Sequence, residues 1–198
     1  LPKLEEEPEA GADIIPRPVS FLKRYKTVFA KRSSHIYLLT TMLASLIFFT
    51  YITSVSFMYM DVFELSKQAF SFYFGINVIG LILFNFVNAR LVPKLGSQKI
   101  LMVASTALLL LTLLFFTLSM IKGSVIVMIA SLIPCVCLTS IIGANADSLT
   151  LQQFDQNTGT VTAVIGTLRF GSGALAGPLL AFSFDGSVLP ISTLFLIS

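Results

Sequence analysis

Two full charges fall well inside the long apolar stretches of this sequence, where a charged side chain could bind an ion or a polar ligand. Arg169 lies in the middle of the glycine-rich stretch 158–182, and Asp147 lies near the end of the apolar stretch before it. A charge that faces lipid at mid-depth costs about 3 kcal/mol or more, so Arg169 must face protein or trapped water. Arg169 is therefore either paired for structural reasons or part of a substrate or ion path.

Polar side chains in two other apolar stretches are candidates for the same path. Asn77 lies near mid-depth, and Asn85 falls within about 80° of it on a helix. Amides in hydrocarbon need hydrogen-bond partners, so these residues either join helices or border a wet cavity. Tyr51 and Ser54 lie among phenylalanine and methionine residues. That composition suits an adaptable pocket wall, although lipid-facing or core aromatic residues would give the same pattern.

The residues around Arg169 are small enough for another helix to approach closely. Gly166 and Gly173 fall within about 60° of Arg169 on a helix, and Gly177 falls within about 80°. Small residues at four-residue spacing allow two helix backbones in lipid to come close together. We therefore predict that Gly166, Gly173, Gly177 and the adjacent Pro178 pack against a neighbouring helix.

The sequence lacks the residue patterns of common enzymes and metal sites. It has no glycine-rich phosphate loop, no H-E-x-x-H motif and no paired carboxylates on one helix face. His35 is the only histidine, and Cys135 and Cys137 point about 200° apart on a helix, so they share neither a disulfide nor a metal. We expect no enzyme activity, no metal or cofactor, and no nucleic-acid partner.

The composition is that of a membrane protein. Of 198 residues, 55% are hydrophobic and 12% are charged, whereas soluble domains are about a quarter charged. Five apolar stretches are near the length of about 20 residues that crosses a bilayer, and a shorter sixth runs to the last residue. They cover residues 36–60, 69–91, 100–121, 125–151, 161–184 and 188–198. We predict an all-α membrane protein with a six-helix transmembrane bundle over residues 35–198, its last helix truncated.

The region before the bundle divides into two segments. Residues 1–17 contain five acidic side chains and three prolines, a composition that predicts a cytoplasmic linker. Residues 18–34 are basic, with Phe21, Tyr25 and Phe29 at helical spacing. They form either an amphipathic helix on the anionic cytoplasmic face or a solvated segment before the membrane. Because the chain starts at Leu1 and ends within an apolar stretch, we expect it to be part of a longer protein.

The distribution of lysine and arginine predicts the orientation of the bundle. Ten of the 13 cations lie before the first span or after the second, and only Lys67 and Lys122 lie in loops of the other side. The positive-inside rule therefore places the first group in the cytoplasm. This group consists of Lys3, Arg17, Lys23, Arg24, Lys26, Lys31, Arg32, Arg90, Lys94 and Lys99.

Asp147 and Arg169 form a possible charge pair in this topology. Both lie in the cytoplasmic halves of consecutive helices, at depths of about 6 Å and about 15 Å. The axial gap of about 9 Å exceeds a hydrogen bond, so pairing requires Arg169 to reach toward the cytoplasm or the helices to be staggered. Otherwise Arg169 borders a cavity and Asp147 snorkels to the surface.

Several local patterns occur in the order and spacing of one transporter family. Asn88-Ala-Arg-Leu-Val92, followed by Lys94, Gly96 and Lys99, is similar to the loop between spans eight and nine of major facilitator superfamily transporters. The stretch 159–178 resembles span eleven, and Asp185-Gly-Ser187 before Pro190 resembles the turn into span twelve. Nearly the whole chain resembles the C-terminal half of the Bcr/CflA (bicyclomycin-resistance) drug/proton antiporters.

The resemblance implies a transporter that exports small amphipathic molecules in exchange for protons by alternating access. It also implies a multi-pass protein of the cell inner (plasma) membrane, with the lipid bilayer, the substrate, protons and an N-terminal six-helix half as partners. The antiporter motif is incomplete, because Ala181 stands where glycine is expected. The residues that usually couple protons lie in the other half, so proton coupling depends on the resemblance alone.

Two alternatives remain at this point. A metabolite facilitator would have the same fold, and a non-transporting membrane scaffold subunit would have the same composition. A scaffold needs no polar residues at mid-depth, so Asn77, Asn85 and Arg169 argue against it.

The predicted orientation is tested by accessibility labelling. In a variant without Cys135 and Cys137, we expect an impermeant thiol reagent to label Ser124→Cys but not Lys94→Cys in intact cells. The opposite pattern would reverse the orientation.

Overall fold

The protein is described by a computed structural model that covers residues 21–154, 158–183 and 185–198, with side chains from Tyr25 onward. The linker predicted for residues 1–17 lies outside the described residues. The described residues form seven α-helices and one π-helical turn without any strand, as predicted for an all-α membrane protein. Five of the helices are long and apolar enough to cross a membrane.

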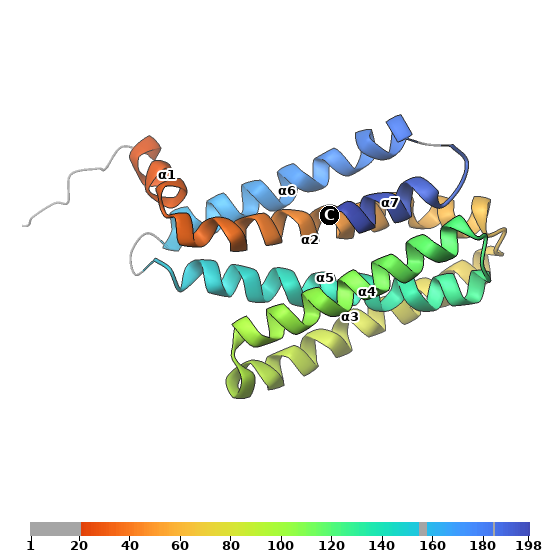
Figure 1. Ribbon diagram of the computed structural model, residues 1–198, viewed down its shortest axis with the longest axis horizontal. Helices are drawn as coiled ribbons and strands as arrows, with labels where there is room; N and C mark the ends of the chain where they lie inside the picture. Colours follow the sequence, from red (N-terminus) through yellow and green to blue (C-terminus); the bar gives the residue numbers. More distant parts are fainter. Residues whose placement is uncertain (1–20, 155–157, 184) are drawn as a thin grey trace, which may run out of the picture.

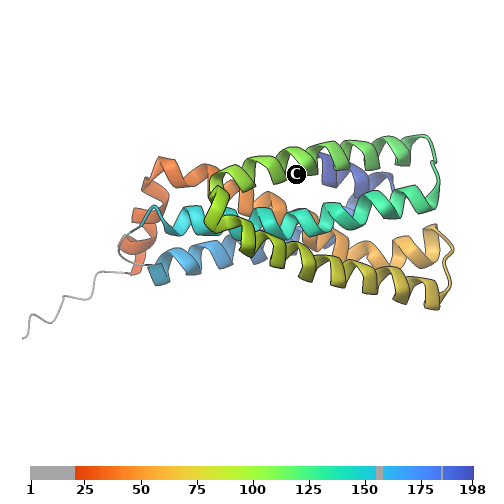
Figure 2. The same ribbon diagram turned by 90° about the horizontal axis from the view of Figure 1, so that it is seen from below.

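The long helices lie alongside one another as an elongated bundle (Figure 1). In chain order the elements are α1 (Phe21–Ala30), α2 (Arg32–Phe57), the π-helical turn (Met58–Val62), α3 (Lys67–Leu95), α4 (Ser97–Met120), α5 (Val125–Leu151), α6 (Thr158–Ser183) and α7 (Leu189–Ile197). Short connections join consecutive long helices at the ends of the bundle, as the view turned by 90° also shows (Figure 2). Helix α1 lies at one end of the bundle, beside the starts of α2 and α6.

Two boundaries differ from the sequence prediction. The connection expected between the stretches 69–91 and 100–121 shrinks to Gly96, because α3 continues through Pro93 to Leu95 and α4 starts at Ser97. Gly96 has a φ of 78°, a left-handed conformation in which glycine carries no steric penalty. The basic helix predicted for residues 18–34 ends at Ala30, because Lys31 is extended and the next residue begins α2.

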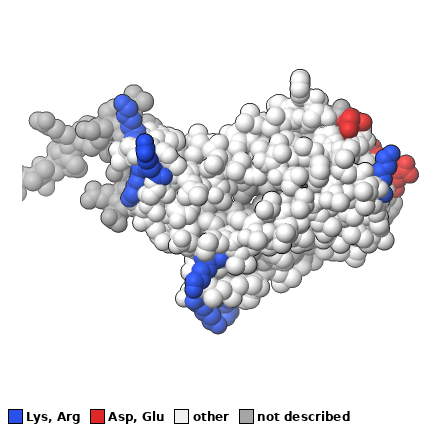
Figure 3. Space-filling view, in the orientation of Figure 1, with Lys and Arg blue, Asp and Glu red and all other residues white. Residues whose placement is uncertain are grey.

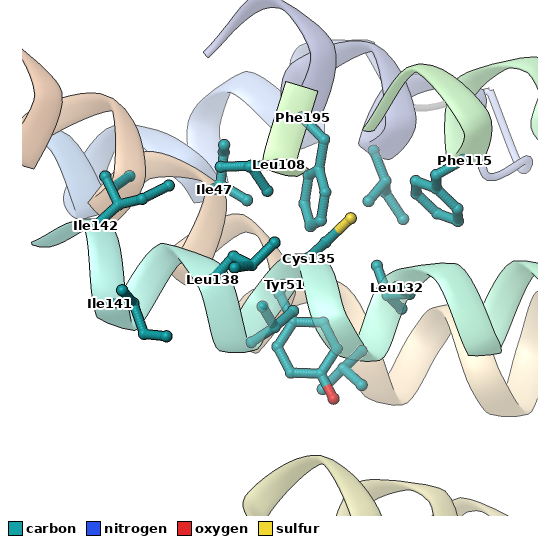
Figure 4. Close-up of a cluster of buried hydrophobic side chains, with 14 of the residues drawn as sticks. Ile47, Tyr51, Leu108, Phe115, Leu132, Cys135, Leu138, Ile141, Ile142 and Phe195 are labelled. Atoms are coloured by element: carbon teal, nitrogen blue, oxygen red, sulfur yellow. The ribbon is translucent and has the colours of Figure 1, made fainter. Parts of the chain in front are cut away.

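Helix α5 lies at the centre of the apolar core. Its side chains pack with those of α2, α4 and α7, and the close-up in Figure 4 shows residues from all four helices meeting. Phe115, Leu132 and Phe195 are almost completely buried, as is Cys135. Both cysteines are free thiols. In contrast, α3 leaves much of its apolar surface exposed, with Ile79, Ile82 and Phe86 among the exposed side chains.

Hydrogen bonds between amide and hydroxyl side chains join α3 to α5. Asn85 Nδ2 donates to Ser140 Oγ over 2.9 Å, and Asn145 Nδ2 donates to Asn88 Oδ1 over 2.9 Å. These bonds satisfy polar groups that have no water to bond within a bilayer. Of the two roles considered for Asn77 and Asn85, Asn85 has the interhelical one in this structure, and Asn88 has the same role.

Helix α1 packs against α2 and α6, and Lys31, which follows α1, contacts the residues after α5. Val28 is buried against Leu38 and the start of α6, while Lys31 donates to the Gln153 carbonyl and lies 5.0 Å from the centre of the Phe154 ring. Lysine and arginine side chains gather at this end and at the α3–α4 connection, and acidic side chains gather at the opposite end (Figure 3). The folded molecule therefore keeps the charge asymmetry of its sequence.

Gly173 allows α2 and α6 to come close together. A Cβ atom at this position would overlap the ring of Phe49 on α2. A Cβ at Gly166 or Gly177 would meet no atom within 4 Å, and Pro178 is exposed. Among the described residues, only Gly173 of this predicted set makes a contact that needs a small residue, because the others lie on parts of α6 that face no neighbouring helix.

We expect Gly173→Ala to lower the stability of the bundle. The new methyl group would force the Phe49 ring to move, and overpacking costs about 1–3 kcal/mol, which exceeds the gain of about 1 kcal/mol from replacing a helical glycine. Gly177→Ala is the matched control, since it gains the same propensity without a clash. Unfolding in detergent micelles measures both, and equal stabilities would contradict the packing role of Gly173.

Candidate functional site

A cleft of about 450 Å³ lies between α2, α5 and α6. It contains the two charges that the sequence places inside apolar stretches. The lining residues are Ala44, Ser45, Phe48 and Phe49 from α2, Thr139, Ser140, Gly143, Ala144 and Asp147 from α5, and Arg169 and Phe170 from α6.

Asp147 and Arg169 form an ion pair at the wall of this cleft. Arg169 Nη2 donates to Asp147 Oδ2, and the Thr41 hydroxyl of α2 donates to the other carboxylate oxygen over 2.8 Å. The side chains are 36% and 20% exposed for Arg169 and Asp147 respectively. The pair is therefore partly desolvated but still open to the cleft.

The Arg169 side chain passes Gly143 of α5 on its way to Asp147. Arg169 Nη2 lies 3.6 Å from the position that a Cβ of Gly143 would occupy. Gly143 is one helical turn before Asp147 on α5. The guanidinium therefore lies beside Gly143 and reaches the carboxylate from there, which is one of the two ways of pairing that the predicted depths allowed.

The hydroxyl groups of the cleft already donate their hydrogen bonds within the protein. Ser45 Oγ donates to the carbonyl of Thr41, and Thr139 Oγ1 donates to the carbonyl of Val136. Ser140 is bonded to Asn85 of α3. Such bonds satisfy hydroxyl groups in a helix interior. The hydroxyls therefore contribute acceptor oxygens to the cleft, while their protons are engaged.

Aromatic rings form the apolar part of the wall. The centres of the Phe48 and Phe49 rings are 5.7 Å apart, and those of Phe49 and Phe170 are 6.0 Å apart. Both pairs have edge-to-face geometry, which is favourable for aromatic rings. Phe170 is 66% exposed, so part of this surface is available to an apolar molecule in the cleft.

Of the sequence-predicted path residues, only Arg169 lines the cleft. Tyr51 and Asn77 are each 1% exposed and lie inside the bundle. The Tyr51 hydroxyl points toward the side of α3 (Figure 4), and Asn77 Nδ2 has no hydrogen-bond partner among the described residues. Ser54 borders a separate hollow of about 160 Å³. Asn85 reaches the cleft indirectly, through Ser140.

Among the residues that were not singled out from the sequence are Thr41, which bonds to Asp147, and Phe170, which lines the cleft. Thr41 holds Asp147, but one threonine in an apolar helix has no distinguishing pattern. Phe170 follows Arg169 directly. The chain has many phenylalanines, so the sequence alone does not show which of them line a cleft. Within the described part of the chain, no three histidine, cysteine or acidic side chains come together to hold a metal.

Comparisons with known proteins agree with this membrane architecture. The sequence model of the Major Facilitator Superfamily matches residues 1–178. The chain is 22% identical over 150 residues to the uncharacterized MFS-type transporter YdgK of Bacillus subtilis (strain 168), covering 76% of this chain and 37% of that protein. It is 26% identical over 133 residues to a bicyclomycin resistance protein homolog of Haemophilus influenzae (strain ATCC 51907 / DSM 11121 / KW20 / Rd), covering 67% of this chain and 33% of that protein. The matched segments thus span about a third of the length of these relatives, and no solved structure matches the chain significantly.

The ion pair predicts non-additive effects of its two charges on stability. Asp147→Ala and Arg169→Ala each leave one partly buried charge without its counter-ion, so the double variant should lose about 1 kcal/mol less than the sum of the single losses. Unfolding in detergent micelles measures this double-mutant cycle. Asp61 and Lys122, which are exposed and form no ion pair with any described residue, provide a control cycle that should be additive. Additive losses for Asp147 and Arg169 would show that the pair does not contribute to folding.

Proposed function

Because this chain belongs to the major facilitator superfamily of membrane transporters, we propose that it forms one half of an exporter for small amphipathic molecules. The superfamily assignment covers most of the chain, whereas the substrate and the direction of transport are parts of the proposal. Members of this superfamily transport many kinds of molecule. Among these functions, the similarity to a bicyclomycin resistance protein homolog supports drug export. Transporters of this type function in the lipid bilayer, and we place this one in the cell inner (plasma) membrane.

The cleft between α2, α5 and α6 carries the proposal. Binding sites for small molecules are mostly apolar concavities with a few placed polar groups. Here aromatic rings supply the apolar surface, and the Asp147–Arg169 pair supplies the polar one. A volume of about 450 Å³ falls in the range of about 300–1,000 Å³ typical of such sites. A purely structural membrane subunit would have no need for this combination.

The proposed mechanism is alternating access. In transporters of this kind two repeats rock against each other around a binding site near the middle of the bilayer. The described helices would act as one of these repeats, with α5 held on several sides by α2, α3 and α4, and a second six-helix half would close the cleft. Proton coupling enters the proposal through the family resemblance, with protons driving export.

The proposal is tested by measuring transport. The sample is the protein in the form that its native cell produces. After reconstitution into liposomes, it should move fluorescent amphipathic compounds faster than protein-free liposomes, and an imposed pH gradient should accelerate the movement. A protonophore that collapses the gradient provides the control. A transport rate that does not depend on the pH gradient would favour the facilitator alternative. No transport of any compound would favour a scaffold subunit.

The 198-residue chain alone should not transport, because alternating access requires two halves that move against each other. The same liposome assay measures this. Transport by the isolated chain above the protein-free background would refute the two-half mechanism.

A further inference from the structure

The guanidinium of Arg169 has hydrogen-bond donors that the ion pair does not use. An arginine side chain carries five N–H donors in a planar fork. Only Nη2 is engaged, by Asp147, and neither Nε nor Nη1 has a partner among the described residues. The side chain is 36% exposed and lines the cleft. The unused donors are therefore accessible to a molecule in the cleft.

Asp147 is held independently of Arg169. Its Oδ1 accepts a hydrogen bond from Thr41 on α2, and its Oδ2 accepts one from Arg169. With both oxygens engaged, this carboxylate offers less to a cationic ligand than Arg169 offers to an anionic one. The serine and threonine hydroxyls of the cleft donate to other protein groups. Unused positive donors are thus concentrated at Arg169.

The apolar surface next to Arg169 fits the body of an amphipathic ligand. Phe170 adjoins Arg169 in the chain, and Phe49 lies between Phe170 and Phe48. Gly173 allows the Phe49 ring to occupy this place, because any larger residue would collide with it. An aromatic or aliphatic group on these rings would bring an attached anionic group toward the guanidinium.

We propose that Arg169 binds the carboxylate of an amphipathic organic anion whose apolar body lies against Phe48, Phe49 and Phe170. A carboxylate matches the planar fork of arginine, which binds it with two parallel hydrogen bonds. This inference rests on the proposed function, because it makes the ligand of the cleft the transported substrate. An anionic lipid headgroup presents similar oxygens, and the experiment separates the two sources.

Binding of three ligands with one aromatic body tests the proposal. The ligands are 2-naphthoate, its neutral amide and the cation 2-naphthylmethylammonium, and equilibrium dialysis measures their binding to the native-length protein in phosphatidylcholine nanodiscs. We expect 2-naphthoate to bind most tightly. Arg169→Gln should weaken its binding about tenfold or more, the loss of a charge-assisted hydrogen bond, and should leave the amide within about twofold.

Asp147→Asn tests the same site in the opposite direction. It removes a negative charge beside the guanidinium, so 2-naphthoate should bind several-fold more tightly. The amide oxygen of asparagine still accepts the hydrogen bond from Thr41, so the contact between α2 and α5 is preserved. Gly177→Ala, on an open part of α6, is the control and should bind like the unaltered protein. Unchanged 2-naphthoate affinity in both charge variants, or equal binding of all three ligands, would overturn the proposal.

Three further outcomes identify the source of the bound anion and separate the anion site from the export function. Displacement of 2-naphthoate by phosphatidylglycerol, without transport of 2-naphthoate, would assign the site to a lipid headgroup and overturn the substrate assignment. Arg169-dependent binding without transport of any compound would refute export and leave the anion site intact. Transport of neutral amphipathic compounds without 2-naphthoate binding would refute the anion site and leave the export function intact.

Discussion

The need to accommodate the charge of Arg169 within a membrane span is the constraint on which the cleft depends. A guanidinium that faced hydrocarbon would cost several kcal/mol, so it requires a counter-ion and a polar environment. Asp147 supplies the charge, Thr41 positions Asp147, and Gly143 leaves a surface over which the arginine extends. Because both side chains stay partly exposed, this pair lies on the wall of a cleft, outside the closed apolar core.

The remaining surface of α5 explains how this polar wall is held in place. On other sides of the same helix, Cys135 and Leu132 belong to the apolar core, and Asn145 bonds to Asn88 of α3. One helix therefore contacts the core, a polar interface and the cleft. Site residues on a helix that is packed in this way have better-defined positions than residues on loops.

The fold and the substrate of this protein are inferred from different observations. The superfamily match shows that the chain belongs to the major facilitator superfamily, and five of its helices are long and apolar enough to cross a membrane. The same fold serves many substrates, so the substrate must be argued from the side chains of the site. Identities of 22% and 26% over about a third of each relative carry no information about which ligand fits beside Arg169.

The sequence by itself determined the membrane class, the positions of the long helices and the presence of two charges within those helices. The bounds of α5 agree with its apolar stretch, because hydropathy over about 20 residues is a local property. Only the tertiary structure decided which neighbour each helix face meets. Asn77 and Tyr51 are buried inside the bundle. A Cβ at Gly177 would contact no atom, whereas a Cβ at Gly173 would overlap Phe49. A helical repeat groups residues on a face, but the partner of that face depends on packing between segments distant in the chain.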